Sequence, residues 1–489
     1  SINCAVNEYD VSKVVLKLYG DKFVCADSKK GIWYEFQKHR WVQMDDSVKL
    51  EKLIVDGVIK VYQNFLDRHP DDAEAVGKII AKLKTIAFVK KVVAMCKLDL
   101  HDNKMMSKLD KNKMLFGCEN GVLDLELGIF REGRPDDYLT FSCGQNYTVY
   151  SPDDTDILEL DDYLTKIFPN IDRREFHLDF YSSCLQGGNV HKIFRINTGG
   201  GDNGKSVDMN LIEKVFGDYC KTFPPELFIE SSRGNSSGAA RPELARAEGT
   251  RIMRFDEIAG SKTIDIGVLK LLTGNDKVFS RGLYSNGEDM AFQFVLVLSC
   301  NKVPAIPEED ATWDRTKIVD YESRFVKPRD LSDYPVPDTL EEQIKMKRFK
   351  ADPNFTDKID GIASALLYTL FERYKAKKGK LNVPDIVNLS TKRRRREHDI
   401  YLKFIENCLE KIDSPEAGGI YTPHTEIYTE YNGWYRENYP SMIKEKAGSD
   451  TLRTELLKRL GSRTESNPFG YGEKKRLYGY TIAREEGGD

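Results

Sequence analysis

Apolar residues recur at helical spacing through much of the N-terminal part of the chain. Positions three and four residues apart are apolar over 50–62 and again over 76–93, which predicts two helices that each bury one face. Over 31–42 aromatic residues instead flank a polar turn, a pattern typical of two short strands. Asn120-Gly121 fits a tight turn. We therefore expect residues 1–150 to form a mainly helical N-terminal domain.

The pattern then changes from helical to alternating. Two amphipathic helices are expected in a connector over 151–190, and from 191 to 330 short apolar runs alternate with helical segments. That alternation is typical of a parallel sheet with helices on both faces. A continuous helical pattern over 339–377 follows, within a segment expected to form a helical lid and a basic linker over 331–391.

The C-terminal part, 392–489, carries a different pattern. Three helices are expected near 400–411, 424–438 and 449–460, followed by a strand, a turn and a strand over 469–482. Three helices and a hairpin suggest a winged-helix-like domain. The sequence as a whole therefore predicts a multidomain α/β protein.

A phosphate-binding pattern follows the apolar run at 193–198. The sequence Gly199-x-x-x-x-Gly204-Lys205-Ser206 opens a helical segment, and glycines let backbone N–H groups point at phosphate oxygens without Cβ clashes. Lys205 is expected to reach the β and γ phosphates, and the Ser206 hydroxyl to bind Mg²⁺. The residues expected at the nucleotide are Gly199, Gly200, Gly201, Asp202, Asn203, Gly204, Lys205, Ser206 and Val207. The alternative is a glycine turn that matches by coincidence.

Polar residues end the next two strands that the sequence predicts. Asp256 is expected to bind Mg²⁺ and Glu257 to act as the base toward the attacking water, with a pair of plain surface acids as the alternative. Asn301 would hydrogen-bond the water or the γ phosphate, or else form an Asx turn. Arg315 is a candidate arginine finger for a neighbouring subunit's nucleotide, or a surface salt bridge. The expected ligands are thus ATP and Mg²⁺.

Composition places few restrictions on this reading. The chain of 489 residues is 40% hydrophobic and 31% charged, and its net charge of −4 means that any nucleic-acid contact must be local. The run Lys392–Arg396 is one candidate contact, with a solvated linker or a helix start as the alternative. Nine cysteines without a C-x-x-C pair and seven histidines without metal-ligand spacing favour reduced thiols in a cytosolic-type compartment. No apolar stretch approaches about 18 residues and no signal-peptide layout occurs, so neither a membrane span nor secretion is indicated.

The order of the motifs resembles the superfamily 3 helicases, specifically the primase-helicases of poxviruses and other nucleocytoplasmic large DNA viruses. The resemblance rests on Trp33-Tyr34, Asn120 to Asp124, Gly199 to Ser206, Asp256-Glu257, Leu269 to Asp276 with Arg281, Ser299 to Pro304, and Trp313 to Arg315. It implies an AAA+-like P-loop core, ATP bound between subunits of a hexameric ring, and movement on single-stranded or forked DNA with 3′ to 5′ polarity. It also implies an upstream primase domain or replication-protein partners, and a place in the host cytoplasm at sites of viral replication.

The resemblance also implies a DNA-binding hairpin between the acids and Asn301. Lys277 and Arg281 would offer charge to phosphates, and Tyr284 a stacking face. The turn Ser285-Asn286-Gly287 departs from the family pattern because it carries no cation and precedes two acids, so a contact at the tip stays open. Arg281 has alternatives as well, at the nucleotide site or in hairpin packing.

The C-terminal domain offers a second set of cations. Ser449 is expected to cap a helix with basic residues on its polar side, and the hairpin after it contains a basic turn. The cations proposed for phosphate contact are Arg453, Lys458, Arg459, Lys474, Lys475 and Arg476. From 392 to 489 there are 18 basic and 17 acidic residues, a net charge of +1, so a protein-contact module is an equal alternative.

Four functions are compatible with these motifs. An ATP-driven DNA helicase at a replication fork leads; an AAA-type protein-remodelling ATPase, a nucleotide-gated loading module without unwinding, and a small-molecule kinase follow. Stimulation of ATP hydrolysis by single-stranded DNA separates the first from the second, and strand separation separates it from the third. A kinase is disfavoured because neither a lid arginine cluster nor an acceptor pocket is evident in the sequence.

Overall fold

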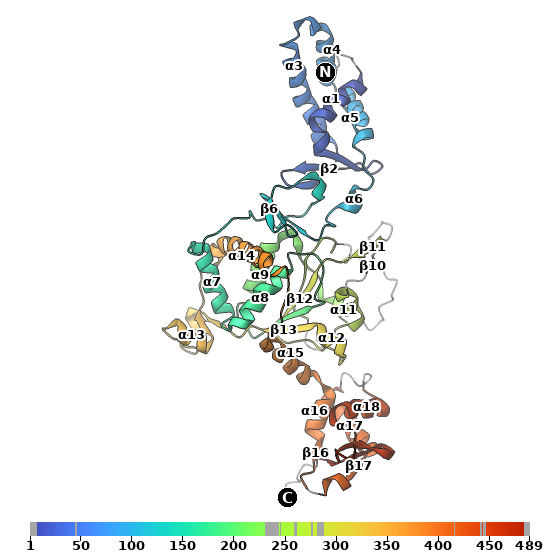
Figure 1. Ribbon diagram of the computed structural model, residues 1–489, viewed down its shortest axis with the longest axis vertical. Coiled ribbons are helices and arrows are strands. Elements are labelled where there is room, and N and C mark those ends of the chain that lie inside the picture. Colours follow the sequence, from blue (N-terminus) through green and yellow to red (C-terminus); the bar gives the residue numbers. More distant parts are fainter. Residues whose placement is uncertain are drawn as a thin grey trace. The chain divides into compact units, whose positions relative to one another are not determined.

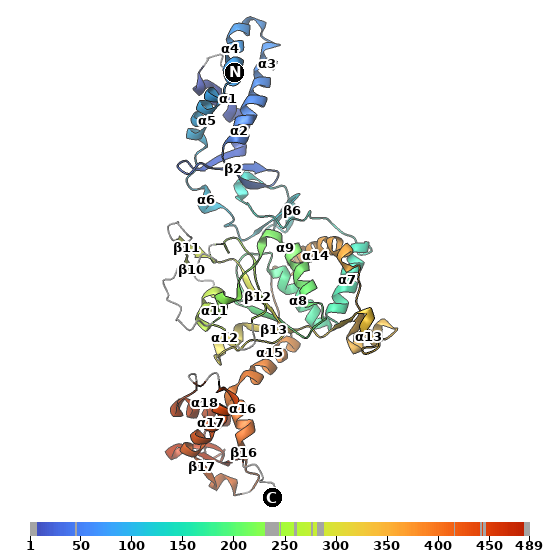
Figure 2. The same cartoon turned by 180° about the vertical axis from the view of Figure 1, so that it is seen from behind.

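The computed structural model describes residues 7–44, 46–229, 244, 246–258, 262–274, 277–280, 288–414, 416–440, 443 and 446–483 (Figures 1 and 2). The chain is a mixed α/β protein that divides into two compact units. The larger unit comprises Ser1–Ala305 and Asp314–Asn388, and the smaller comprises Ile306–Trp313 and Leu389–Asp489. The smaller unit is therefore built from two separate stretches of chain.

The larger unit begins with helices and a small antiparallel sheet. The elements are α1 (Glu8–Tyr19), β1 (Phe23–Asp27), β2 (Ile32–Gln37), β3 (Arg40–Met44), α2 (Val48–Leu53), a π-helical turn (Ile54–Val58), α3 (Ile59–Leu66), α4 (Ala73–Leu83), α5 (Ile86–Leu100) and α6 (Met105–Lys108). Asn7 starts α1, because its side-chain oxygen accepts a hydrogen bond from the backbone of Asp10 at 2.8 Å. The strands predicted over 31–42 and the helical segment predicted over 50–62 are confirmed.

The single helix predicted over 76–93 is wrong. The chain breaks between α4 and α5, where Thr85 adopts extended dihedral angles. Its hydroxyl donates to the carbonyl oxygen of Lys82 at 2.7 Å, a local bond that competes with the helical ladder. Apolar spacing continues through the break because both helices contribute to the same core, in which Val76, Ile79 and Val89 are buried.

A second antiparallel sheet follows, made of β4 (Leu115–Cys118), β5 (Gly121–Asp124) and β6 (Ile129–Arg131). Cys118 pairs with Gly121, so a tight turn forms from Glu119 and Asn120, one residue earlier than the predicted Asn120-Gly121 turn. The backbone N–H of Gly117 donates to the Tyr219 hydroxyl at 2.8 Å. This buried bond ties the small sheet to the core that follows.

A parallel sheet of five strands forms the centre of the larger unit. Its order is β13 (Thr316–Asp320), β7 (Phe194–Thr198), β12 (Val295–Cys300), β9 (Ile252–Asp256) and β8 (Cys220–Thr222). Figures 1 and 2 show one group of helices on one side of the sheet, α7 (Thr155–Ile167), α8 (Ile171–Ser183), α9 (Lys205–Phe216) and α14 (Phe355–Lys377), and α11 (Ile266–Thr273) on the other. The predicted parallel sheet with helices on both faces is confirmed, as are the two helices predicted in the connector.

The register of this sheet brings several strand ends together. Thr198 at the end of β7 pairs with Cys300 of β12 and with Asp320 of β13. Asp256 at the end of β9 pairs with Ser299 of β12. The residues that follow β7, β9 and β12 therefore emerge at one edge of the sheet.

The continuous helix predicted over 339–377 is also wrong. The segment forms α13 (Leu340–Met346), then strand β15 (Arg348–Lys350), which pairs with β14 (Arg324–Val326), and then α14. Lys347 ends α13 in the left-handed conformation, with φ of 54°. Asp352-Pro353-Asn354 separates β15 from α14, since the residue before a proline is disfavoured in a helix.

The smaller unit contains the three helices predicted near the C-terminus. They are α16 (Ile400–Cys408), α17 (His424–Asn438) and α18 (Ser449–Leu460). The strands are β16 (Leu409–Lys411) with β20 (Tyr480–Ile482), and the sheet β17 (Tyr421–Pro423), β19 (Arg476–Tyr478) and β18 (Gly470–Gly472). The predicted cap is wrong, because Gly448 occupies the N-cap position of α18 and no side chain caps it.

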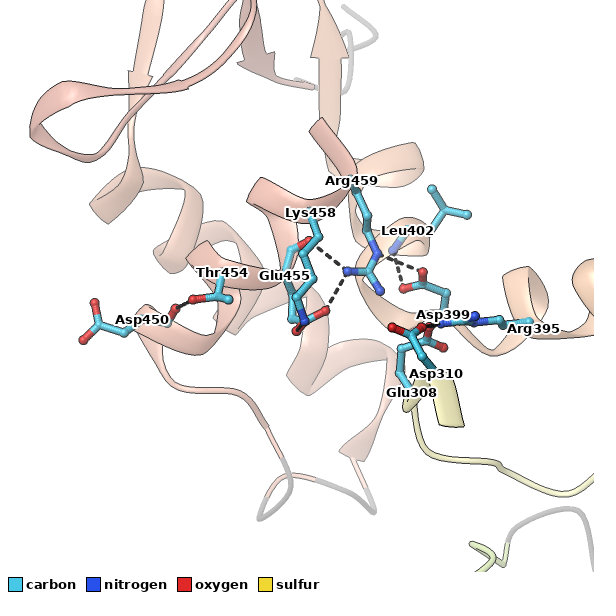
Figure 3. Close-up of polar contacts among 10 residues, drawn as sticks. All are labelled: Glu308, Asp310, Arg395, Asp399, Leu402, Asp450, Thr454, Glu455, Lys458 and Arg459. Carbon is cyan, nitrogen blue, oxygen red and sulfur yellow. Dashed lines mark hydrogen bonds and ion pairs between the residues drawn. The ribbon is translucent and has the colours of Figure 1, made fainter. Parts of the chain in front are cut away.

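Two helices cross the boundary between the units, α12 (Asp310–Arg315) and α15 (Asp385–His398). The basic run Lys392–Arg396 lies inside α15. Arg395 contacts the Ile306–Trp313 stretch of the smaller unit: its guanidinium lies 2.5 Å from Glu308 Oε1 and 2.5 Å from Asp310 Oδ1 (Figure 3). One cation of this run is thus engaged by two acids of its own unit.

Two expectations concern the whole chain. Within the described ranges, no helix combines the length and apolar character needed to span a bilayer. The cysteines at 25, 96, 118, 143, 184, 220, 300 and 408 are buried free thiols.

Candidate functional site

The glycine-rich loop runs from β7 into α9 at the edge where the strand ends meet. Gly199 has φ of 157° and Gly204 has φ of 79°. A Cβ at Gly199 would collide with the Asn203 side chain and the Tyr321 carbonyl, and one at Gly204 would collide with Ile167. By contrast, a Cβ at Gly200 or Gly201 would meet no heavy atom within 4 Å. The loop is therefore packed on its inner side and open on the other.

Lys205 lies at the first position of α9 and is 8% exposed. Its Nζ donates to the Gly199 carbonyl oxygen at 3.3 Å and to Asn301 Oδ1 at 3.0 Å. Burial lowers the pKa of Lys205, because the ammonium group loses hydration. Ser206 and Val207 beside it are exposed. The amine thus lies between the open loop and the polar ends of the strands.

Asn301 joins Lys205 to Glu257. Its Nδ2 donates to Glu257 Oε1 at 3.0 Å, while its Oδ1 accepts from Lys205. Glu257 has φ of 26°, a conformation that non-glycine residues rarely adopt and that stores strain. Lys205, Asn301 and Glu257 therefore form one continuous hydrogen-bonded chain, although they lie on three different segments.

Asp256 faces a cation of its own strand. Arg254 Nε donates to Asp256 Oδ1 at 2.9 Å, and Arg254 Nη1 contacts Glu213 Oε2 at 2.9 Å. The Asp256 side chain is 48% exposed. No cluster of three or more His, Cys, Asp or Glu side chains within the described ranges is arranged to hold a metal. A carboxylate and a serine hydroxyl beside a glycine-rich loop nevertheless fit Mg²⁺, which keeps waters and phosphate ligands rather than needing an all-protein cage.

A cavity of about 470 Å³ adjoins the loop. Gly204 and Val207 form part of its wall, with Ile167, Phe325 and Phe355 giving it apolar and aromatic character. Lys327, which also lines it, holds Asp202 at 2.7 Å. Such a cavity beside the glycine-rich loop suits a flat, largely apolar group.

Arg315 does not lie with the other predicted catalytic residues. It precedes Thr316, which pairs with Phe194 at the start of β7, whereas the loop follows Thr198 at the end. Over the 5 residues of β13 this separation is about 16 Å, at roughly 3.3 Å per residue. Arg315 Nη1 instead donates to Thr273 Oγ1 at 2.8 Å. Lys205, Asp256, Glu257 and Asn301 gather at one edge of the sheet, and Arg315 lies at the opposite edge.

The expected hairpin is partly described. Strand β10 (Lys277–Ser280) pairs antiparallel with β11 (Glu288–Ala291). Lys277 is in β10, while Arg281 and Tyr284 lie outside the described residues. The role of these three residues in DNA binding stays a prediction.

The comparisons with known proteins agree with one another. Residues 12–169 match the family described as D5 N terminal like. A protein of Acanthamoeba polyphaga mimivirus, named as a candidate helicase, is 31% identical over 450 residues, which cover 88% of this chain and 46% of that protein. A protein of African swine fever virus, named as a candidate primase, is 24% identical over 479 residues, covering 90% of this chain and 48% of that protein. This chain belongs to the primase-helicase family of the large DNA viruses.

The chain spans about half the length of the curated relatives in the family that it matches. Among solved structures, the apo C-terminal region of NrS-1 aligns over 98% of this chain and 100% of its own, with 11% identity and a TM-score of 0.42. That score is too low to define a shared fold.

One group of residues behind the site was missed by sequence reasoning. Asp208 of α9 is fully buried and accepts hydrogen bonds from the hydroxyls of Tyr321 at 2.6 Å and Tyr163 at 3.1 Å. Arg195 of β7 is fully buried as well, and its Nη2 contacts His177 Nδ1 at 3.0 Å. Burial raises the pKa of Asp208, and the nearby Arg195 charge opposes that shift. The signal in the sequence was an arginine flanked by two apolar residues, Phe194 and Ile196.

Proposed function

We propose that this chain is the ATP-driven DNA helicase part of a primase-helicase of superfamily 3, with an AAA+-type core. The observation that carries the proposal is the hydrogen-bonded chain from Lys205 through Asn301 to Glu257 beside the open glycine loop. It joins a buried cation, suited to phosphate, to a carboxylate suited to accept a proton from water. Helicase names among the relatives support the same assignment.

ATP is the expected substrate of the loop. Its phosphates would take the place of the Gly199 and Asn301 oxygens as acceptors for Lys205, and its base would enter the cavity lined by Phe325 and Phe355. Ser206 and Asp256 would hold Mg²⁺, which draws negative charge from phosphate oxygens when bound. Glu257 would accept the proton of the attacking water, and Asn301 would keep its carboxylate oriented.

Replacing Glu257 with Gln should separate ATP binding from hydrolysis. The amide keeps a hydrogen-bonding partner for Asn301 but cannot take a proton, so turnover should fall by at least about a hundredfold. ATP affinity should change by less than about threefold, because the phosphate contacts remain. Single-turnover hydrolysis and equilibrium nucleotide binding measure the two quantities. A Gln variant that hydrolyses ATP at half the wild-type rate would remove Glu257 from the role of base.

The position of Arg315 supports a ring with ATP between subunits. Because it lies at the sheet edge opposite to Lys205, we propose that it acts on the nucleotide of a neighbouring copy rather than its own. We expect a hexamer that moves on single-stranded or forked DNA, contacts it through Lys277, Arg281 and Tyr284, and works with an upstream primase domain or replication proteins. The smaller unit would be a winged-helix-like domain.

Arg315→Ala subunits mixed with wild-type subunits test this arrangement. If the arginine acts across an interface, activity should fall more steeply than the wild-type fraction, because one variant subunit disables its neighbour's site. ATP hydrolysis against mixing ratio, with particle mass followed in the same buffer, gives the curve. The matched control is Lys317→Ala, two residues further along the chain, which should give a linear curve. A linear loss with Arg315→Ala as well would assign the arginine to its own subunit.

The proposed function is tested by steady-state ATP hydrolysis with and without single-stranded DNA, followed by a forked-duplex unwinding assay. Strong stimulation by DNA together with strand separation is the expected result. Hydrolysis indifferent to DNA would instead favour protein remodelling. DNA binding and hydrolysis without strand separation would favour a loading module.

A further inference from the structure

The outer face of the small sheet β17–β19–β18 carries an unusual set of side chains. Tyr421 lies directly opposite Tyr478, and Thr422 opposite Leu477. Thr422 and Leu477 are buried in the unit's core. Because side chains alternate along a strand, Tyr421, Tyr478 and Arg476 all project from the other face.

These side chains form a row of alternating character. The Arg463 guanidinium lies 3.9 Å from the centre of the Tyr478 ring. The Tyr478 and Tyr421 ring centres are 5.5 Å apart, and the Arg476 guanidinium lies 4.0 Å from the centre of the Tyr421 ring. Each guanidinium lies over a tyrosine ring, which restricts its motion before any partner binds. Binding therefore costs little additional side-chain conformational entropy.

Nothing neutralises this row among the residues that the structure describes. Neither Arg463 nor Arg476 forms an ion pair there, and Tyr421 is 39% exposed. On β18, Gly470 pairs with Tyr478 and Gly472 with Arg476, so the neighbouring strand offers no side chain to cover the row. The four side chains Arg463, Tyr478, Tyr421 and Arg476 thus make an open, positively charged strip, called here the Arg–Tyr strip.

Two of the three cations of α18, Lys458 and Arg459, differ from the strip because each pairs with an acid. Lys458 Nζ lies 2.6 Å from Glu455, and Arg459 Nε lies 2.8 Å from Asp399 (Figure 3). Lys475 at the turn of the hairpin likewise pairs with Asp450 at 2.9 Å. A phosphate would have to displace these acids, whereas it would displace none at the Arg–Tyr strip.

We propose that the Arg–Tyr strip is a binding site for single-stranded nucleic acid. Bases would stack on the exposed ring and guanidinium planes, and phosphates would pair with Arg463 and Arg476. An acidic peptide would use the two arginines but would leave the adjacent rings without a matching partner. The site is separate from the ATP-binding edge, and it goes beyond the proposed translocation activity.

The test uses the full chain and a fluorescent oligo-dT probe, without nucleotide, followed by anisotropy. Arg463→Gln/Arg476→Gln should weaken binding about tenfold or more at low salt. It should also reduce the slope of log affinity against log salt by roughly 1.4, at about 0.7 for each lost phosphate contact. The matched control, Lys458→Gln/Lys475→Gln, removes the same charge from acid-paired positions and should change both quantities little.

A second variant keeps the charge and removes the rings. Tyr421→Leu/Tyr478→Leu should weaken single-strand binding by roughly tenfold, since stacking is worth about 1–3 kcal/mol per base, and should leave duplex binding unchanged. The proposal would be overturned if neither the double arginine variant nor the double tyrosine variant lost affinity for the single strand. It would also be overturned if the lysine control variant lost as much affinity as the arginine variant. Lost affinity for a polyglutamate peptide with full DNA affinity would also overturn it, in favour of a protein partner.

Two readouts keep these outcomes interpretable. Thermal unfolding and basal ATP hydrolysis of the variants should match wild type, because the strip lies outside the core and the catalytic edge. If only the proposal for the Arg–Tyr strip is wrong, the wild-type protein still shows ATP hydrolysis that is stimulated by DNA. If the proposed helicase function is wrong, the wild-type protein itself lacks that stimulation.

Discussion

Lys205→Ala should reduce ATP hydrolysis to the background rate. The lysine is buried at the start of α9, and its side-chain amine donates to the Gly199 and Asn301 oxygens, both at the place where phosphates would lie. Removing a positioned donor of this kind costs at least about a hundredfold in rate, and a full positive charge is worth more. Phosphate release under steady-state conditions, with and without single-stranded DNA, measures the loss.

Lys214→Ala is the matched control for that variant. Lys214 lies on the same helix, is 36% exposed and pairs with Asp360 on the surface, so its removal should leave the rate within about twofold. Substantial hydrolysis by Lys205→Ala, in protein that folds like wild type, would mean that the glycine loop does not bind the substrate's phosphates. The Glu257 and Asn301 assignments would then lose their basis as well.

Asp208→Ala should have the largest effect on stability. The substitution leaves the Arg195 charge uncompensated inside the protein, and it removes the acceptor of two buried tyrosine hydroxyls. Breaking a buried charged group of this kind costs about 3 kcal/mol or more. Hydrogen exchange in peptides that span β7 and α9 should accelerate by roughly a hundredfold, since about 1.4 kcal/mol corresponds to a factor of ten.

Two further variants separate charge from hydrogen bonding in this group. Asp208→Asn keeps an acceptor for Tyr321 and Tyr163 but loses the charge, so it should fall between wild type and Asp208→Ala. Glu213→Ala, on the same helix with a half-exposed side chain, should cost no more than about 1 kcal/mol. If Asp208→Ala costs no more than Glu213→Ala, the buried group does not hold α9 against β7.

The sequence predicted the elements around the site better than their contacts. The strand at 193–198, the glycine loop and the helix after it follow from short-range patterns, and so does the end of a strand at Asp256. The contact between Lys205 and Asn301 does not follow from short-range patterns, because it depends on β7 and β12 being neighbours in the sheet. Strand order is a property of the whole fold, and apolar spacing carries no information about it.

Each error of the sequence prediction has a physical cause. Periodicity ran through Thr85 because α4 and α5 face the same core, and it hid β15 because three residues are too few to show a strand pattern. The sequence also does not predict the two buried charged residues, Arg195 and Asp208. Arg195 and Asp208 look like surface residues in the sequence, and only their mutual placement, with two tyrosines, explains their burial.

The interleaved stretch Ile306–Trp313 affects how truncations of this protein are read. It starts a few residues after Asn301 and ends two residues before Arg315, yet it belongs to the same compact unit as Leu389–Asp489. Deleting everything after Asn388 would eliminate Arg395, the ion-pair partner of Glu308 and Asp310. It would also eliminate His398, whose ring contacts the buried ring of Trp313. A truncation mutant that stops hydrolysing ATP would therefore report damage between two residues that we propose to be catalytic, and its phenotype would not measure what the C-terminal residues bind.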